Sequence, residues 1–438
     1  MALPNPVIFI PGITASYLKD VYPLPPETLW SVLKKQYDRA KMHPDNVALE
    51  ATQPSLVRPD QLFEIAYEEL IEELRYNLSP SPDRPVPVFP FAYDWRQPLH
   101  LIEGHLAEFI DEVIARTKLM GHYHPAFAKK PKVNIIAHSM GGLITAGYVE
   151  SHGAEKIDKI ATLATPYNGS FEAIVKMTTG TADMGGSNPS SREREASRVT
   201  PALYHLIPDF DTGMILPDGS TLPKDSFSAK LWQPSIIDTV REYVHRYSVT
   251  KARSSARGTK LFDDLLKTAK THRNRVAGLK LKDAGLDKKR WLAVVGTGTE
   301  TRVRMSIRNK RNKPEFVLTS KDRLNNWGHD DTDTARQTGD GTVHFEGAIP
   351  KFLDYESLVC VTPQDYGYWE VADRLISGKA GLHGILPNMN MLHRMLVRYF
   401  WGWGDPRGNT WGRSAPGVDK KDWAKATPLK LRHKDPVD

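Results

Sequence analysis

Short apolar runs rich in β-branched residues alternate with longer stretches of helical periodicity, and no other feature of the sequence limits its fold so strongly. The apolar runs are Pro6–Ile10, Val86–Phe89, Val133–Ala137, Lys159–Ala164 and Trp291–Gly296. The helical stretches include Leu62–Arg75, Leu99–Lys118 and Gly141–Glu150. Apolar runs without polar alternation are typical of parallel strands that are buried on both faces. The sequence therefore predicts an α/β fold with a mainly parallel central sheet flanked by helices.

The alternation weakens between residues 168 and 290. There Thr178–Glu195 is rich in Gly, Ser and charged residues, whereas Ile236–Tyr247 has helical periodicity. A chain of 438 residues is also longer than one hydrophobic core usually supports. We therefore expect a core in two parts, residues 1–167 and 291–410. Residues 168–290 would form an inserted cap or lid region, and residues 411–438 a polar C-terminal tail. Within the cap, Thr178–Ser191 is the candidate for a mobile lid.

The positive charge of the chain is concentrated in one segment. Residues 251–323 hold 21 Lys and Arg against 7 Asp and Glu, an excess of 14, although the whole chain has a net charge of +7. The remaining residues therefore carry a net charge of −7. A basic segment on an acidic body predicts a face that meets an anionic partner, such as a phospholipid surface or nucleic acid. A solvated surface insertion is the simpler interpretation of the same segment.

Composition excludes several classes of protein and site. Cys360 is the only cysteine, so neither a disulfide-stapled scaffold nor a multi-cysteine zinc site is expected. The histidines lack the spacing of a metal site and residues 296–298 lack the rest of a nucleotide-binding fingerprint, so we expect no metal and no cofactor. No apolar stretch approaches ~18 residues, and the N-terminal run Val7–Ile10 is too short for a signal peptide. The sequence therefore predicts a soluble, cytoplasmic protein.

A serine lies where an apolar strand pattern runs directly into a helical one. In the segment Val133–Gly142, Ser139 has Ala137 two positions before it and Gly141 two positions after it. A nucleophile elbow needs small residues at both positions, because its serine occupies a strained strand-to-helix turn where backbones approach closely. The following helix would present free N–H groups, including that of Met140, to a developing oxyanion. We therefore predict that Ser139 is a nucleophile; a serine that only caps a helix is the alternative.

A nucleophilic serine needs a base and an orienting acid, which in this class of fold follow it along the chain as Asp or Glu and then His. Asp340 is bracketed by glycines in Gly339–Thr342, where a sharp loop can aim a carboxylate at an imidazole. His383 lies in Gly381–Gly384, just before a helical pattern. Other aspartates and histidines of this region remain candidates for the two roles: Asp330, Asp331, Asp333, His344 and His393.

Six segments spread over residues 6–400 carry a resemblance to a known family: Pro6–Ser16, Phe91–Arg96, Val133–Gly142, Ala161–Ser170, Gly339–Val343, and His383 with Leu386–Asn388. On these segments the chain resembles the lecithin:cholesterol acyltransferase-like branch of the α/β-hydrolases, which includes phospholipid:diacylglycerol acyltransferases and related phospholipases. Tyr-Asp-Trp-Arg after a strand, combined with Gly-Asp-Gly-Thr-Val, is more specific than the serine motif alone. The resemblance implies an α/β-hydrolase fold with a poorly matched middle insertion.

Carried over position by position, the resemblance implies that Ser139 is the nucleophile, Asp340 the orienting acid and His383 the general base. It also places an oxyanion donor in the loop Gly12–Thr14. There we expect the backbone N–H of Ile13 to act together with that of the residue after the nucleophile.

Three further residues have two interpretations each. Trp30 follows the oxyanion loop and is expected either to line an acyl pocket or to pack in the core. Asp94 and Arg96 could supply a second acid and a phosphate clamp, but we favour a structural ion pair that fixes their loop.

The predicted function is a serine-dependent acyl hydrolase or O-acyltransferase that acts on a phospholipid-like ester through an acyl-enzyme on Ser139. In this hypothesis the basic segment 251–323 makes peripheral contact with an anionic membrane, and no nucleic-acid partner is expected. Two alternatives remain open: a carboxylesterase for small soluble esters, and a noncatalytic lipid-binding protein with the same fold. The sequence gives no indication of the oligomeric state.

Overall fold

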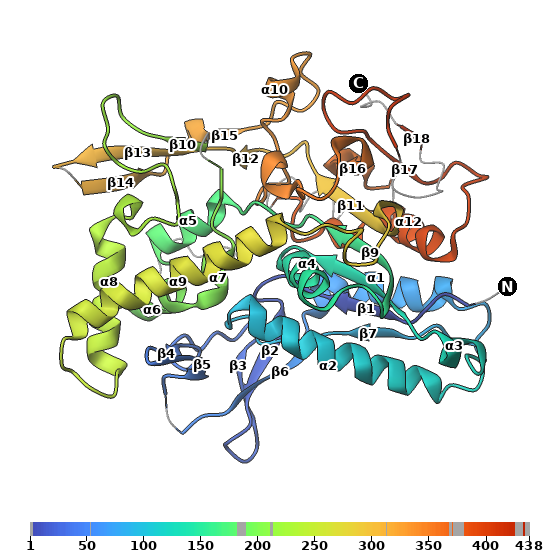
Figure 1. Cartoon of the computed structure of the whole chain (residues 1–438), viewed down its shortest axis with the longest axis horizontal. Coiled ribbons are helices and arrows are strands. Elements are labelled where there is room, and N and C mark those ends of the chain that lie inside the picture. The colour runs from blue at the N-terminus through green and yellow to red at the C-terminus, as the bar shows by residue number, and fades with distance from the viewer. Residues whose placement is uncertain are drawn as a thin grey trace.

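A computed structural model describes the chain apart from residues 1–2, 53, 182–189, 211–212, 312, 368–369, 371–380, 425–431 and 434–438. Its central sheet has six strands in the order β16-β11-β9-β8-β1-β7, and every neighbouring pair is parallel. In chain order the strands are β1 (Val7–Ile10), β7 (Val88–Pro90), β8 (Val133–His138), β9 (Ile157–Leu163), β11 (Trp291–Gly296) and β16 (Leu358–Val361). The predicted α/β class with a parallel sheet flanked by helices is confirmed (Figure 1).

Helices cover both faces of this sheet. Side chains of successive strand residues point to opposite faces, so Ile8 and Ile10 of β1 belong to one hydrophobic cluster and Val7 and Phe9 to another. The first cluster includes residues of α2 (Leu99–Lys118), α4 (Met140–His152) and α9 (Ser254–Ala277), and the second those of α1 (Glu64–Leu78) and α12 (Asn390–Trp401). Strands β1, β11 and β16 are buried along their whole length and consist almost wholly of apolar residues, which is why such runs stand out in the sequence.

Two small antiparallel sheets lie between β1 and α1 in the chain. One has the order β3-β2-β6, and the other pairs β4 with β5. Their bounds are β2 (Ser16–Asp20), β3 (Glu27–Trp30), β4 (Met42–His43), β5 (Asn46–Glu50) and β6 (Val57–Leu62). These strands were not predicted, because they are short and half-exposed and lack a continuous apolar run.

Residues 168–290, which the sequence analysis predicts as an inserted cap, are mainly helical. They hold α5 (Phe171–Thr179), α6 (Ser191–Val199), α7 (Pro201–His205), β10 (Met214–Ile215), α8 (Pro234–Tyr247) and α9. The described residues among them add no strand to the central sheet. A buried ion pair, Lys41 Nζ to Glu195 Oε2 at 2.8 Å, joins them to the small sheets, and the Tyr243 hydroxyl donates to the carbonyl of Met42. Residues 182–189 of the lid candidate Thr178–Ser191 lie outside the described residues.

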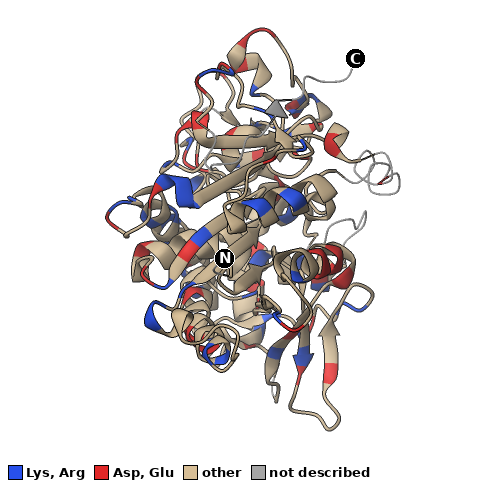
Figure 2. Ribbon diagram, turned by 90° about the vertical axis from the view of Figure 1, so that its right-hand side faces the viewer, with Lys and Arg blue, Asp and Glu red and all other residues tan. Residues whose placement is uncertain are grey.

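Many charges of the basic segment 251–323 are paired within the protein. Arg and Lys side chains of this segment form ion pairs with acids that lie outside it: Arg257 with Asp45, Lys270 with Asp209, Arg275 with Glu103, Arg290 with Asp158 and Arg323 with Glu172. In Figure 2, Lys and Arg are interspersed with Asp and Glu rather than gathered on one side of the ribbon. The net charge of +14 on residues 251–323 is therefore partly neutralised by ion pairs with the rest of the chain, which carries a net charge of −7.

The remaining elements are short: α3 (Ala126–Lys129), β12 (Thr301–Arg302), β13 (Met305–Lys310), β14 (Lys313–Val317), β15 (Arg323–Leu324), α10 (Thr332–Ala335), β17 (Trp411–Gly412) and β18 (Arg432–His433). The C-terminal segment differs from the polar tail that the sequence suggested. Trp423 is buried and donates its indole N–H to the carbonyl of Leu358 at 2.8 Å, and Arg413 is buried against Asp365. Residues 411–424 therefore pack against the edge strand β16.

The ion pair predicted for the Tyr-Asp-Trp-Arg motif is present. The Arg96 guanidinium is buried and donates from Nε to Asp94 Oδ1 at 2.8 Å and from an Nη atom to Asp94 Oδ2 at 2.6 Å. The same Nη atom donates to Glu50 Oε1 at 2.9 Å, which ties this loop to β5. These contacts confirm the structural interpretation, because both ends of the guanidinium are already occupied by protein carboxylates.

Arg96→Met is therefore expected to destabilise the fold by about 3–5 kcal/mol, because two buried carboxylates lose the cation that compensates them. Urea unfolding followed by circular dichroism measures this loss. Arg308→Met is the matched control, since Arg308 pairs with Glu315 at an exposed site and its removal is expected to leave the unfolding midpoint unchanged. Equal midpoints for the two variants would contradict the role given to Arg96.

Candidate active site

Ser139 occupies a strained turn between β8 and α4. Its backbone has φ 53° and ψ −125°, a combination that non-glycine residues rarely adopt. Close backbone contacts hold the turn: a Cβ on Gly141 would lie 2.5 Å from the carbonyl oxygen of Ile10, and one on Gly12 would lie 3.1 Å from Ser139 Cβ. The small residues around Ser139 are therefore required for the β8–α4 turn to approach the end of β1.

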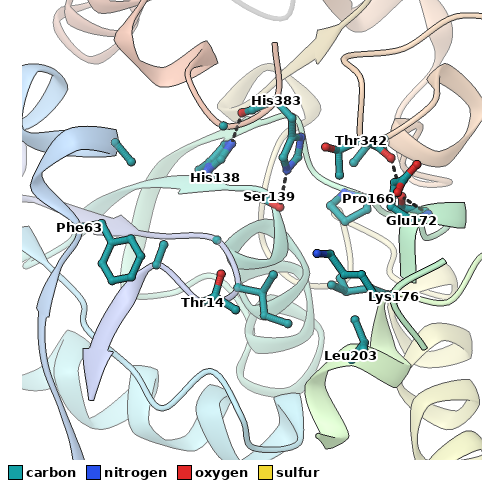
Figure 3. A pocket seen from close by; sticks show the side chains of 18 of the residues that line it. Thr14, Phe63, His138, Ser139, Pro166, Glu172, Lys176, Leu203, Thr342 and His383 are labelled. Carbon is teal, nitrogen blue, oxygen red and sulfur yellow. Dashed lines mark hydrogen bonds between the residues drawn. The ribbon is translucent and has the colours of Figure 1, made fainter. Parts of the chain in front are cut away.

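His383 and Asp340 complete a hydrogen-bonded chain that ends on this serine. His383 Nε2 lies 2.8 Å from Ser139 Oγ, and His383 Nδ1 lies 2.7 Å from Asp340 Oδ2. Figure 3 shows the His383 ring pointing toward Ser139. The second carboxylate oxygen of Asp340 accepts the backbone N–H groups of Thr342 at 2.9 Å and Val343 at 2.7 Å, so the carboxylate is fixed from both sides. All three predicted residues thus meet at one place.

The rival residues lie elsewhere and have other contacts. The Asp331 side chain caps α10 by accepting the N–H of Thr334, and Asp330 and Asp333 are on the exposed surface of the same region. The His344 ring is buried and packs against the Phe210 ring with centroids 4.6 Å apart. His393 Nε2 bonds to the carbonyl of Pro387 within its own segment at 2.7 Å. None of these contacts brings a rival to Ser139.

The loop after β1 lies against the serine. Thr14 has a positive φ of 64°, and its carbonyl accepts the indole N–H of Trp30 at 2.9 Å. Among the described residues, the backbone N–H groups of Ile13 and Met140 donate no hydrogen bond, whereas that of Gly12 donates to the Tyr67 hydroxyl at 3.0 Å. The two N–H groups expected to bind an oxyanion are therefore left available.

A cavity of about 300 Å³ opens beside Ser139. Most of its walls are apolar side chains and backbone from the β1 loop, the small sheets, α1 and the inserted helices: Ile13, Ala15, Trp30, Val32, Phe63, Ala66, Pro166, Ala173, Leu203, Leu206 and Val343. Lys35 also lines it. Lys176 lines it as well (Figure 3). Trp30 thus contributes to the cavity while it packs against Trp95, with ring centroids 4.7 Å apart.

Tyr67 and His138 also belong to this site, although the sequence analysis did not identify them. The Tyr67 hydroxyl lies 2.9 Å from His138 Nδ1, and His138 Nε2 lies 2.9 Å from the carbonyl oxygen of His383. Burial, followed by the neighbouring His383, lowers the pKa of His138 well below its ordinary value. The position of His138 directly before the nucleophile was a usable signal, but Tyr67 shares the apolar spacing of α1 and looks like an ordinary core residue.

Other kinds of site were sought in the part of the chain that the structure describes. No group of three or more His, Cys, Asp and Glu residues there could hold a metal ion. No described helix is both long and apolar enough to cross a bilayer. Cys360 is buried in β16, and this burial raises the pKa of its thiol to about 12.

Comparisons with known proteins concern the family and the fold of the chain. The family profile described as lecithin:cholesterol acyltransferase matches residues 83–346. A solved chain from a structure described as "The crystal structure of Tle4-Tli4 complex" superposes with a TM-score of 0.58 at 14% sequence identity, covering 80% of this chain and 89% of that one. Likeness at this identity concerns the fold alone. The matched family lies in the α/β-hydrolase superfamily, in agreement with the fold expected from the sequence. A search of curated proteins finds no match.

Proposed function

The chain belongs to the lecithin:cholesterol acyltransferase family of α/β-hydrolases, and from this premise we propose that it is a serine-dependent acyl hydrolase or O-acyltransferase for phospholipid-like esters. The observation that carries the proposal is the chain of hydrogen bonds from Asp340 through His383 to Ser139. A histidine at 2.8 Å can take the serine proton, and a carboxylate on its other nitrogen fixes the tautomer that this requires.

In the first half of the reaction, Ser139 Oγ attacks the ester carbonyl carbon while His383 Nε2 takes the hydroxyl proton. The carbonyl oxygen becomes an oxyanion. Its collapse breaks the bond to the leaving alcohol, which receives the proton from His383 and leaves an acyl group on Ser139. In the second half, water or an alcohol loses its proton to His383 and attacks the acyl carbonyl. The serine is regenerated, and the product is a fatty acid or a new ester.

Two groups of contacts stabilise the charges that form. The available N–H groups of Ile13 and Met140 would donate to the oxyanion, and each such donor lowers the barrier by about 3 kcal/mol. The Asp340 carboxylate lies against the edge of the imidazole that becomes positive and stabilises that charge. Neither contribution requires the site to reorganise during the reaction.

The walls of the cavity favour a lipid ester. An acyl chain can leave water along the apolar side chains of the cavity, which include Trp30, Phe63 and Leu203. The charged side chains that line the same cavity, Lys35, Lys176 and Glu172, are few beside these apolar ones. A small soluble ester would use little of this apolar surface. A noncatalytic protein would have no need of a strained serine held against a histidine.

Product analysis on phospholipid vesicles tests the proposal. We expect radiolabelled fatty acid to appear if water resolves the acyl-enzyme, and a labelled new ester to appear on addition of a long-chain alcohol if an alcohol resolves it. Short-chain nitrophenyl acetate is the comparison substrate. Turnover of the acetate with no product from the vesicles would replace the proposal with the soluble esterase, and turnover of neither substrate would favour a noncatalytic protein.

The same vesicles test peripheral contact through residues 251–323. Lys280, Lys282 and Lys289 of this segment are exposed, and no ion pair between described residues includes them. If they face an anionic membrane, co-sedimentation with phosphatidylglycerol vesicles should fall as the salt concentration rises. Binding that is equally strong at low and high salt would assign membrane contact to apolar side chains instead.

A further inference from the structure

We propose that Tyr67 and His138 are positioning residues that hold the oxyanion loop and the base His383 in a fixed mutual arrangement. The inference rests on the proposed function, because it concerns the geometry in which the Ser139 chemistry takes place. Neither side chain has a part in the proton transfers described above. Their contribution comes from three buried hydrogen bonds that join two parts of the chain more than 300 residues apart.

The three bonds form one continuous path. The backbone N–H of Gly12 donates to the Tyr67 hydroxyl oxygen at 3.0 Å, the Tyr67 hydroxyl lies 2.9 Å from His138 Nδ1, and His138 Nε2 lies 2.9 Å from the carbonyl oxygen of His383. The path begins one residue before Ile13, whose N–H is the proposed oxyanion donor. It ends on the backbone of the residue that carries the base. Loop, helix α1, strand β8 and the His383 loop are thus linked in series.

The direction of every bond follows from its end groups. A carbonyl oxygen only accepts, so the His138 Nε2 must carry a proton when it bonds to His383. A neutral imidazole with a proton on Nε2 has an acceptor at Nδ1, so the Tyr67 hydroxyl must donate to it. The Tyr67 oxygen then has a lone pair for the N–H of Gly12. Only one arrangement of protons satisfies all three bonds, which makes the path a directional constraint.

The surroundings keep His138 in the neutral form that this arrangement needs. The ring is buried, and it faces the rings of Tyr67 and His383 with centroids 5.7 Å and 5.0 Å away. Phe9 packs against Tyr67 with ring centroids 4.8 Å apart. Among the described residues no carboxylate contacts His138, and its desolvation lowers its pKa well below the ordinary value. His138 is therefore uncharged at neutral pH.

Loss of this hydrogen-bonded path would affect both the oxyanion loop and the His383 loop. Without the Tyr67 hydroxyl, the N–H of Gly12 and the Nδ1 of His138 would both be buried without a partner. The oxyanion loop and the His383 loop would then shift to recover hydrogen bonds. Displacements of about 1 Å at a catalytic site cost on the order of 100-fold in rate. The apolar cavity walls formed by Trp30, Phe63 and Leu203 lie outside the path, so most of the surface that binds an acyl chain would be kept. The expected signature is a fall in kcat with a nearly constant KM.

Kinetics of Tyr67→Phe on the ester substrate test this inference. We expect kcat to fall by about 10-fold to 100-fold and KM to change by less than about threefold. Tyr123→Phe is the matched control, since it removes another buried tyrosine hydroxyl, one that donates to the carbonyl of Pro4 at 2.9 Å outside the site. The control is expected to keep the wild-type kcat.

Two variants of His138 provide a second measurement. His138→Leu removes both bonds of the ring, whereas the amide N–H of His138→Gln can still reach the His383 carbonyl, so kcat should be lowest for Leu and intermediate for Gln. The double variant Tyr67→Phe/His138→Leu should be no slower than His138→Leu alone, because both changes interrupt the same path. If His138→Leu does not fold, the kcat values of the wild type, His138→Gln and Tyr67→Phe decide, and both variants should be slower than the wild type.

A kcat for Tyr67→Phe equal to that of Tyr123→Phe, or a loss expressed only in KM, would overturn the inference. So would additive effects in the double variant. Failure of the proposed function looks different, because Ser139→Ala would then keep its activity. If Ser139→Ala is inactive while Tyr67→Phe matches the control, the proposed function stands and the positioning role is rejected.

Discussion

Replacing Ser139 with alanine is expected to lower kcat/KM for ester cleavage by about 10⁶-fold. The change removes the hydroxyl oxygen that lies 2.8 Å from His383 Nε2, so no acyl-enzyme can form. Residual turnover would come from water attack assisted by the oxyanion donors Ile13 and Met140. The same variant should lose all labelling by a fluorophosphonate probe, and peptide mapping of the labelled wild type should place the adduct on Ser139.

The control for this prediction is Ser197→Ala. Ser197 is buried in α6, where its hydroxyl bonds to the carbonyl of Arg194, and it does not line the cavity beside Ser139. Labelling and turnover of Ser197→Ala should match the wild type. A Ser139→Ala protein that folds, as judged by its circular dichroism spectrum, and still reacts with the probe would disprove the nucleophile assignment.

The parts of the fold that the sequence predicted are those set by local patterns. The strand β8, the turn at Ser139 and the helix α4 follow each other without interruption. The apolar strand pattern, the small residues of the turn and the helical periodicity therefore predicted one continuous motif. Trp291–Gly296 and Leu99–Lys118 were also predicted with the bounds that the structure has, because each is a long continuous pattern.

The parts that the sequence did not predict depend on contacts between distant residues. The 24 residues of α9 were not recognised as a helix, since their apolar spacing is diluted by Lys and Arg that pair with acids on other elements. For the acid and the base, the sequence left several aspartates and histidines open. The family resemblance implied Asp340 and His383, and in the structure their contact across 43 residues of sequence separates them from their rivals. Tyr67 lies in an apolar helical pattern that gives no sign of its polar contacts.

Asp340→Asn is expected to lower kcat by about 10⁴-fold while KM changes little. The reason lies in the two sides of the carboxylate. Oδ1 accepts the N–H groups of Thr342 and Val343 at 2.9 Å and 2.7 Å, so an asparagine must keep its carbonyl oxygen on that side. Its NH₂ group then faces Nδ1 of His383 and donates to it. The ring proton is forced onto Nε2, where it blocks removal of the Ser139 proton.

Steady-state kinetics on the ester substrate measure this effect, and Asp331→Asn is the matched control. The Asp331 carboxylate also accepts a backbone N–H, that of Thr334 at 2.8 Å, but it lies at the start of α10 away from His383. Its replacement should leave kcat unchanged. An Asp340→Asn protein within tenfold of the wild-type kcat would show that another group orients His383. If the tautomer argument holds, fluorophosphonate labelling of Asp340→Asn should slow in proportion to kcat, because that reaction needs the same removal of the serine proton.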